Sequence, residues 1–197
     1  MGHELNESTK SPLKDRIRIS ELHRGRPIGL TSLVQYGLLE TLLGYKQKAG
    51  GYSGVLYKFS SFDRSQKFDS AHNQSAFKAQ AGLLIRFLVG VQKNTKIADP
   101  AADPWTQTSQ FALLRPTGVN ACFLILARIL ERHPDAELDF NAYLKPLRSV
   151  NFRRSYVANL GGGWKGFRGL ANNMIRKINK TLPKSRRLRL YGQKEKI

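Results

Sequence analysis

Residues 119–130, VNACFLILARIL, form the most apolar stretch of this 197-residue sequence. Apolar side chains occupy nearly every position, so a helix formed here would be apolar almost all round. A helix of this kind is typical of an element buried on several sides. We therefore predict a helix that follows Pro116, is capped by Thr117 and runs to about His133, and we expect it to be the centre of the fold.

Two amphipathic helices are predicted before this central one. In residues 31–45 apolar side chains recur at helical spacing, with Thr31 or Ser32 as a cap and Gly44 as a stop. A second helix is expected to begin near Ser75. Its predicted apolar stripe consists of Phe77, Ala81, Leu84, Ile85, Leu88 and Val89.

Strands are expected to be short and few. Residues 16–20, RIRIS, alternate charged and apolar side chains, and VLYKFSSF at residues 55–62 is a second candidate strand. Two Asp-Pro pairs in residues 95–110 are expected to interrupt helix formation. Asp139 can cap a short helix that Pro146 kinks or restarts. The predicted fold class is mainly α, a compact helical domain around one buried central helix with at most a few short strands.

The stretch GGGWKGFRGLANNMIRKINK, residues 161–180, predicts a final helix with two different faces. Its apolar side chains recur three and four residues apart, and its cations fall largely off that face. The apolar set is Trp164, Phe167, Leu170 or Ala171, Met174, Ile175 and Ile178. One side is expected to pack on the body, with Trp164 as a core anchor rather than a base-stacking platform.

Positive charge is concentrated at the C-terminal end of the sequence. The chain has 33 lysines and arginines against 14 acids, a formal net charge of +19. Residues 144–197 hold 15 of these cations and a single acid, Glu195. A basic end on a nearly balanced body is typical of proteins that bind polyanions, because such a field repels itself without a counter-charge. The alternative is a solvated tail that serves only solubility.

The three glycines before the last helix are the centre of a predicted phosphate-binding site. Glycine N–H groups and the unpaired N–H groups of a first helical turn can bind an anion. The alternative is that the glycines only permit a sharp turn. The predicted nucleic-acid-binding set is Arg153, Arg154, Gly161, Gly162, Gly163, Lys165, Arg168, Arg176, Lys177, Lys180, Lys184, Arg186, Arg187 and Arg189.

We predict one helical domain, residues 16–182, between two flexible ends. The N-terminal segment, residues 1–15, is polar and does not resemble a signal peptide. The basic tail, residues 183–197, is expected to be flexible when free and to become ordered along a phosphate backbone. The longest apolar run, residues 121–127, is too short to cross a bilayer. A soluble protein is expected, and membrane binding is disfavoured because the core needs the apolar face of the last helix.

Catalytic and metal-binding patterns are not recognisable in the sequence. The four histidines are scattered along the chain, and the single cysteine, Cys122, lies in the central apolar stretch. One cysteine allows neither a disulfide within the chain nor a zinc-type spacing, and it fits a reducing cytoplasm. The acids of residues 131–139 are interpreted as helix-end capping. We expect no cofactor and no metal, and we leave open a nucleic-acid enzyme whose dispersed site is not visible in the sequence.

Four stretches follow one another in a recognisable order: IRFLVGVQKNTKIADPAADPW, FALLRPTGVNACFLILARILE, LDFNAYLKPLRSVNFRR and GGGWKGFRGLANNMIRKI. They include Thr117-Gly118 at the opening of the central helix and Gly163-Trp164-Lys165-Gly166 before the last one. This succession, over about residues 30–178, resembles the C-terminal half of DGQHR-domain proteins, which include the DndB-like proteins of bacterial DNA phosphorothioation systems. The resemblance implies a DNA-associated role, in regulation or in defence linked to DNA modification.

The sequence departs from that family at one point. The Asp-Gly-Gln-His-Arg motif that names it is absent, together with the ParB-like N-terminal half in which it lies. Any activity tied to that half is therefore not carried over. Three hypotheses remain. The first is a nucleic-acid-binding protein, with DNA favoured, that contacts phosphates through its basic end. The second is an interaction module that completes a ParB-like partner or associates with itself, and the third is the nucleic-acid enzyme with a dispersed site.

Overall fold

The computed structural model describes residues 1–43, 45–46, 51–52, 54–56, 63, 65–67, 69–133 and 138–192. Helices make up 60% of the structure and strands 4%, which confirms the mainly α fold class. None of the described helices combines the length and the apolar character that a membrane span requires.

The centre of the fold is helix α5, Pro116–Arg132. Every residue from Gly118 to Ala127 is buried, which confirms the prediction made from the apolar stretch. The predicted cap is wrong, because the N-cap is Arg115 and Pro116 occupies the first turn. Proline suits that place because its fixed φ is already helical and no amide hydrogen is needed there.

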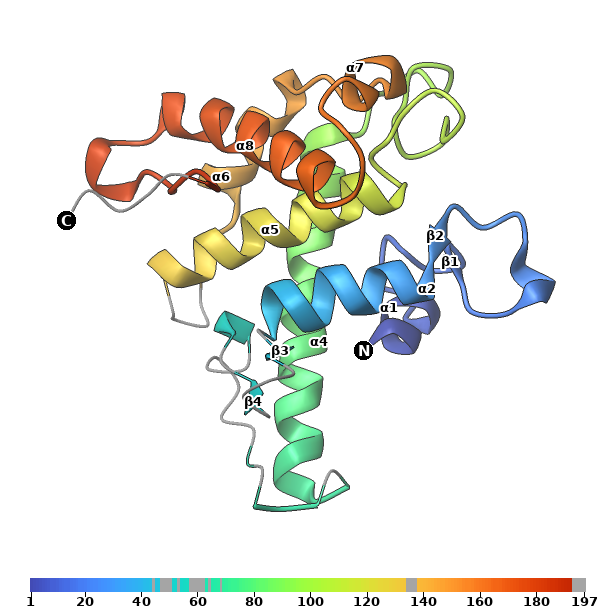
Figure 1. The fold of residues 1–197 in the computed structure, drawn as a ribbon, viewed down its shortest axis with the longest axis vertical. Helices are drawn as coiled ribbons and strands as arrows, with labels where there is room; N and C mark the ends of the chain where they lie inside the picture. Colours follow the sequence, from blue (N-terminus) through green and yellow to red (C-terminus); the bar gives the residue numbers. More distant parts are fainter. Residues whose placement is uncertain are drawn as a thin grey trace.

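Three long elements surround α5. Helix α8, Gly163–Thr181, and the π-helix η2, Leu33–Leu42, pack on it most extensively. Helix α4, Ala71–Thr95, runs across the other three (Figure 1). One continuous hydrophobic core joins these elements, so the chain buries α5 from several directions.

The helix predicted over residues 31–45 differs from the observed one in its winding. A short helix, α2, Leu30–Ser32, follows Gly29 as N-cap, so neither Thr31 nor Ser32 is the cap. It continues into η2, in which the Leu43 amide donates to the Leu38 carbonyl 2.8 Å away, five residues back. The predicted stop, Gly44, lies outside the described residues.

Close packing between η2 and α5 depends on Gly37. A Cβ atom added to Gly37 would lie 2.6 Å from Asn120 Oδ1 and 2.6 Å from a ring carbon of Phe123. Asn120 is 1% exposed, and its side-chain amide has no hydrogen-bond partner among the described residues. Only a residue without a side chain allows the two helices to approach this closely.

Helix α4 begins earlier than predicted and faces the core slightly differently. The Ser70 side chain caps it by accepting a hydrogen bond from the Asn73 amide, so the helix starts at Ala71 rather than near Ser75. The buried stripe contains Ala81, Leu84 and Leu88 of the predicted set, together with Phe87 and Val91, whereas Val89 is 42% exposed. The helix ends before the first Asp-Pro pair, which confirms the predicted interruption.

Strands are short, as predicted. Strand β1, Ile17–Arg18, lies within residues 16–20 and pairs in parallel with β2, Ile28–Gly29. Strand β3, Tyr45–Lys46, pairs antiparallel with β4, Gly51–Tyr52. Of the strand predicted at residues 55–62, only 55–56 are described, and these two are helical.

The N-terminal segment packs on the body instead of remaining free. It forms α1, Gly2–Glu7, and its Leu5 and Leu13 are fully buried. A 3-10 turn, η1, Glu21–His23, links the two strands β1 and β2. Residues 1–15 therefore differ from the predicted flexible end, because two apolar side chains fix them to the core.

The chain after α5 returns through short elements: α6, Asn141–Leu144, η4, Lys145–Ser149, and α7, Arg154–Ala158. The Asp139 carboxylate accepts a hydrogen bond of 2.8 Å from the Asn141 amide, although the N-cap itself is Phe140. Pro146 opens the 3-10 helix η4, so it restarts the chain as predicted. A last 3-10 turn, η5, Lys184–Arg186, follows α8.

Candidate nucleic-acid interface

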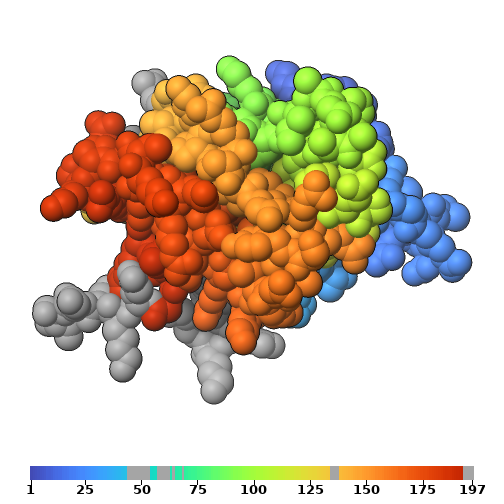
Figure 2. All heavy atoms as spheres, turned by 90° about the horizontal axis from the view of Figure 1, so that it is seen from above, coloured from blue at the N-terminus to red at the C-terminus, as the bar shows by residue number. Residues whose placement is uncertain are grey.

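Residues 138–192 form what we call the C-terminal layer, which consists of α6, η4, α7, α8 and η5. These elements gather over one face of the molecule, as the orange and red atoms in Figure 2 show. Ten of the eleven predicted cationic side chains are exposed there, and Lys177 is half-buried. Most of the predicted cations are therefore exposed on the C-terminal layer.

The three glycines form the turn into α8. Gly161 and Gly163 have positive φ angles of 102° and 51°, which favour glycine, whereas Gly162 is the extended N-cap. A Cβ atom on Gly166 would lie 2.2 Å from the Gly161 carbonyl oxygen, so the turn is folded tightly onto the helix. The turn interpretation accounts for Gly161 and Gly163. It does not account for Gly162, at which a Cβ atom would meet nothing within 4 Å.

The start of α8 is open to solvent. Gly162 and Gly163 are exposed, and no side chain caps the helix. The first N–H groups of a helix have no partner within it, and they carry the positive end of the helix dipole. This end could therefore accept an anion, with Lys165 exposed in the same turn.

The two faces of α8 are arranged as the sequence predicts. Its buried residues are Gly166, Phe167, Leu170, Ala171, Met174, Ile175 and Ile178. At about 100° per residue, Lys165, Arg168, Arg176 and Lys180 fall within an arc of about 120° on the opposite side. Lys177 borders the buried face, which explains its partial burial. From Lys165 to Lys180 the cations extend over about 22 Å of helix.

Trp164 lies at the edge of the core rather than inside it. Its ring meets Tyr36 edge-to-face, with centroids 6.1 Å apart, and Phe167 at 5.8 Å. The Arg168 guanidinium carbon lies 5.3 Å from the centre of the indole ring. Trp164 is therefore only half-buried, and it differs in this from the core anchor that the spacing predicts.

The first part of the basic tail, residues 187–191, is attached to α8 by two asparagines. The Asn179 side chain exchanges two hydrogen bonds of 2.8 Å with the backbone of Leu188. The Asn172 side chain does the same with the backbone of Tyr191, at 2.7 and 3.0 Å. Seven helical residues rise about 10 Å, and three extended residues span nearly the same length. The two pairs therefore match in spacing.

Tyr191 fixes the end of this segment. Its hydroxyl donates to the Leu124 carbonyl, 2.6 Å away, and the Arg128 guanidinium carbon lies 4.1 Å from its ring centre. Burial raises the pKa of the Tyr191 phenol. Leu188 is also buried, so residues 187–191 are packed, unlike the flexible tail predicted from composition.

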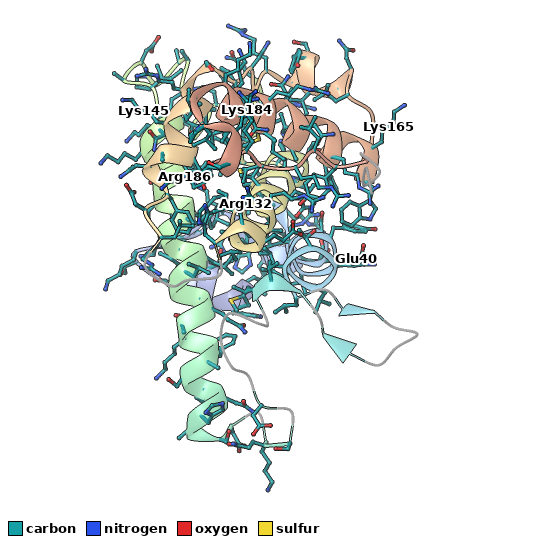
Figure 3. All side chains as sticks on the ribbon, turned by 90° about the vertical axis from the view of Figure 1, so that its left-hand side faces the viewer. Glu40, Arg132, Lys145, Lys165, Lys184 and Arg186 are labelled. Atoms are coloured by element: carbon teal, nitrogen blue, oxygen red, sulfur yellow. The ribbon has the colours of Figure 1, made fainter. Side chains whose placement is uncertain are left out.

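The cations after the far end of α8 lie beside Arg132, which the predicted set omits. Figure 3 places Lys184 and Arg186 on the same side as Arg132 and Lys145, with Lys165 on the opposite side. The Arg132 guanidinium donates to the Ser185 carbonyl. Burial raises the pKa of Tyr143, and the nearby Arg186 and Arg132 partly oppose that rise. Only the folding of α5 against η5 brings Arg132 into this group, so no local pattern could have indicated it.

Arg153 and Arg154 belong to a different part of the layer. The Arg154 side chain donates to the Ser109 carbonyl at 3.2 Å, and the Arg153 guanidinium lies 5.7 Å from the centre of the Phe111 ring. Both are exposed where the chain enters α7. They therefore hold the segment before α5, and the structure records no contact between them and Gly161–163.

The C-terminal layer contains almost no negative charge of its own. Its one acid is Asp139, at its very start. The ion pairs between described residues all involve acids before residue 132, for example Arg128–Glu131 at 2.6 Å. Lys165, Arg176 and Lys180 form no ion pair or side-chain hydrogen bond with the described part of the chain. Their charge is therefore available to an external anion.

Neither a reactive cysteine nor a metal site is found among the described residues. Cys122 is buried, and burial raises the pKa of its thiol to about 12, so it remains a neutral core residue. No group of three or more His, Cys, Asp or Glu side chains that could hold a metal occurs among these residues. Comparison of the chain with protein-family models, with curated proteins and with solved structures found no match.

Proposed function

We propose that this protein binds nucleic acid by contacting phosphates with the exposed cations of the C-terminal layer. The observation that carries the proposal is a row of cations along α8 whose charge no described acid of the layer offsets. Such a surface is electrostatically unfavourable until counter-ions or a polyanion cover it. Phosphate contacts release condensed counter-ions, so binding is expected to weaken steeply with salt.

The dimensions of α8 suit a phosphate backbone. Its cations extend over about 22 Å, and each strand of duplex DNA presents one phosphate per 3.4 Å of axis. Roughly six phosphates of a strand therefore lie within reach of the helix. Contacts of this kind give affinity and register but not sequence selectivity. The resemblance to DGQHR-domain proteins favours DNA as the polymer, with a role in regulation or in modification-linked defence.

The alternative function of this surface is binding to a protein partner, which would need exposed apolar side chains on it. The large apolar side chains exposed among the described residues are Leu22, Val89 and Ile97, and they belong to η1, α4 and the segment after α4. They form no part of the C-terminal layer. An apolar partner is therefore not favoured for this face, and the hypothesis of a ParB-like partner stays a prediction.

The test is a charge-matched comparison of two triple variants. The first variant replaces three cations of α8 by glutamine: Lys165, Arg176 and Lys180. The second replaces three exposed lysines outside the layer by glutamine: Lys10, Lys67 and Lys78. Fluorescence polarisation with a labelled DNA duplex at low salt measures affinity. We expect at least tenfold weaker binding for the first variant and a much smaller effect for the second, because phosphate contacts and not net charge alone are removed. Equal affinities of the two variants would contradict the proposal.

A further inference from the structure

A second cationic surface lies outside the C-terminal layer. It is a groove of about 1070 Å³ between the β1–β2 segment, α2 with η2, and the start of α5. Four arginines line it: Arg18, Arg24, Arg26 and Arg115. The acid in its lining is Glu21. We call this feature the arginine groove.

Two of the arginines are held in fixed positions. The Arg26 guanidinium pairs with Asp15 at 3.0 Å and also donates to the Ile17 carbonyl at 3.2 Å. The Arg115 side chain donates to the Thr108 carbonyl at 3.2 Å. Guanidinium groups that are already oriented lose less conformational entropy when they bind phosphate. Arg26 and Arg115 therefore line the groove in positions that need not change when a phosphate binds.

The other two arginines are available to a ligand. The Arg18 side chain is exposed and forms no hydrogen bond or ion pair with the described residues. Arg24 pairs with Glu21 at 3.1 Å, but both side chains are more than 80% exposed. Exposed pairs of this kind contribute little free energy, so a phosphate can replace the carboxylate at small cost.

The arginine groove borders the start of α8. Tyr36 and Pro116 line the groove. The Tyr36 ring also meets Trp164, and Thr117, the residue after Pro116, lies 3.8 Å from the Cβ position of Gly166. The groove and the start of α8 are therefore neighbours, and the Tyr36–Trp164 aromatic pair lies where they meet.

We infer that the arginine groove takes a single-stranded segment of the nucleic acid whose phosphates lie along α8. The inference rests on the proposed function and adds the kind of polymer to it. The groove is at the upper end of volumes that hold one drug-sized molecule, so it admits roughly two or three nucleotides of a single strand. A duplex, with its two backbones and paired bases, does not fit. Half-exposed aromatic rings beside cations are typical of surfaces that bind single strands.

The test compares a blunt DNA duplex with the same duplex carrying a six-nucleotide single-stranded overhang. The groove variant is Arg18→Gln with Arg24→Gln, both exposed and away from the core. The control is Lys10→Gln with Lys14→Gln, two exposed cations of the same N-terminal part that do not line the groove. Polarisation titrations at several salt concentrations give the affinity and its salt dependence for each protein and each DNA.

We expect the wild type and the control to prefer the overhang, and the groove variant to lose that preference while binding blunt duplex unchanged. The salt slope for the overhang substrate should fall by about 0.7 for each phosphate of the single strand that the variant no longer neutralises. An overhang preference that survives in the groove variant, or is absent from the wild type, would overturn the inference and leave duplex binding by α8 intact. Conversely, the Lys165, Arg176 and Lys180 variant weakens binding of both substrates if the proposed function holds.

Discussion

Helices α5 and α8 pack against each other, yet their side chains have opposite roles. In α5 every residue from Gly118 to Ala127 is buried, and the apolar side chains among them belong to the hydrophobic core. In α8 one face is equally buried, but the other presents cations that contact no acid within the described layer. The difference separates residues that stabilise the fold from residues that are free to bind a ligand. An exposed side chain without a structural partner can be changed without unfolding the protein.

The largest effect is expected in α5. Phe123 is fully buried and lies against the Gly37 position of η2. Replacing it by alanine removes a large apolar side chain and leaves a cavity, so the free energy of unfolding should fall by about 3–5 kcal/mol. Chemical denaturation measures this loss. A change below about 1 kcal/mol would show that α5 is not the core element described above.

The attachment of the tail to α8 comes next in size. Replacing Asn172 and Asn179 together by alanine removes four hydrogen bonds to residues 188 and 191. At about 0.5–1 kcal/mol for each partly exposed bond, the loss should be about 2–4 kcal/mol if the tail contributes to global stability. Amide hydrogen exchange at Leu188 and Tyr191 is the direct readout. Protection equal to that of the wild type would mean that the tail is held by other contacts.

A smaller effect separates the two roles of the turn before α8. Gly162 is the N-cap and has room for a side chain, so Gly162→Asp should cap the helix and stabilise the protein by about 0.5–1 kcal/mol. The same carboxylate would repel a phosphate at the helix start. We therefore expect a more stable protein, measured by thermal unfolding, that binds DNA more weakly, measured by fluorescence polarisation.

Gly162→Ser is the matched control for that variant, because it caps the helix without adding charge. It should stabilise the protein and leave DNA affinity near that of the wild type. If both substitutions leave affinity unchanged, the glycines serve only as a turn and the phosphates bind elsewhere on α8.

The smallest effect on stability is expected from the cations themselves. Replacing Lys165, Arg176 and Lys180 by glutamine removes no described ion pair or side-chain hydrogen bond, so the free energy of unfolding should change by less than about 0.5 kcal/mol. Thermal or chemical unfolding checks this. A loss above about 1 kcal/mol would show that these three cations stabilise the fold, and it would contradict the difference drawn between α8 and α5.

Periodicity was sufficient to predict the elements that bury an apolar face. The uniform run in α5 and the three- and four-residue spacing in α8 each determine one arrangement, because apolar side chains must leave water. The wider winding of η2 could not be predicted in this way. The apolar residues of 33–42 did not distinguish a π-helix from an α-helix, and the observed π-helix places Gly37 close to Asn120.

The candidate site was only partly predictable, because sequence spacing shows which residues share a helix face but not which distant segments meet. The cations of α8 share one helix, so their common face follows from sequence spacing. Arg132 joins Lys184 and Arg186 only because α5 ends beside η5, and the arginine groove gathers residues that are far apart in sequence, such as Arg18 and Arg115. Conversely, Arg153 and Arg154 are near the glycines in sequence but hold residues 109–111 in the fold. Contacts between distant segments leave no local pattern.

The most direct test of the central claim is a salt titration of wild-type protein binding to a DNA duplex. If the cations of α8 neutralise phosphates, the logarithm of the binding constant should fall linearly with the logarithm of salt concentration, with a slope of about −0.9 for each contact. The Lys165, Arg176 and Lys180 variant should have a shallower slope by up to about 2.7. No measurable binding at low salt, or the same slope for both proteins, would contradict the account.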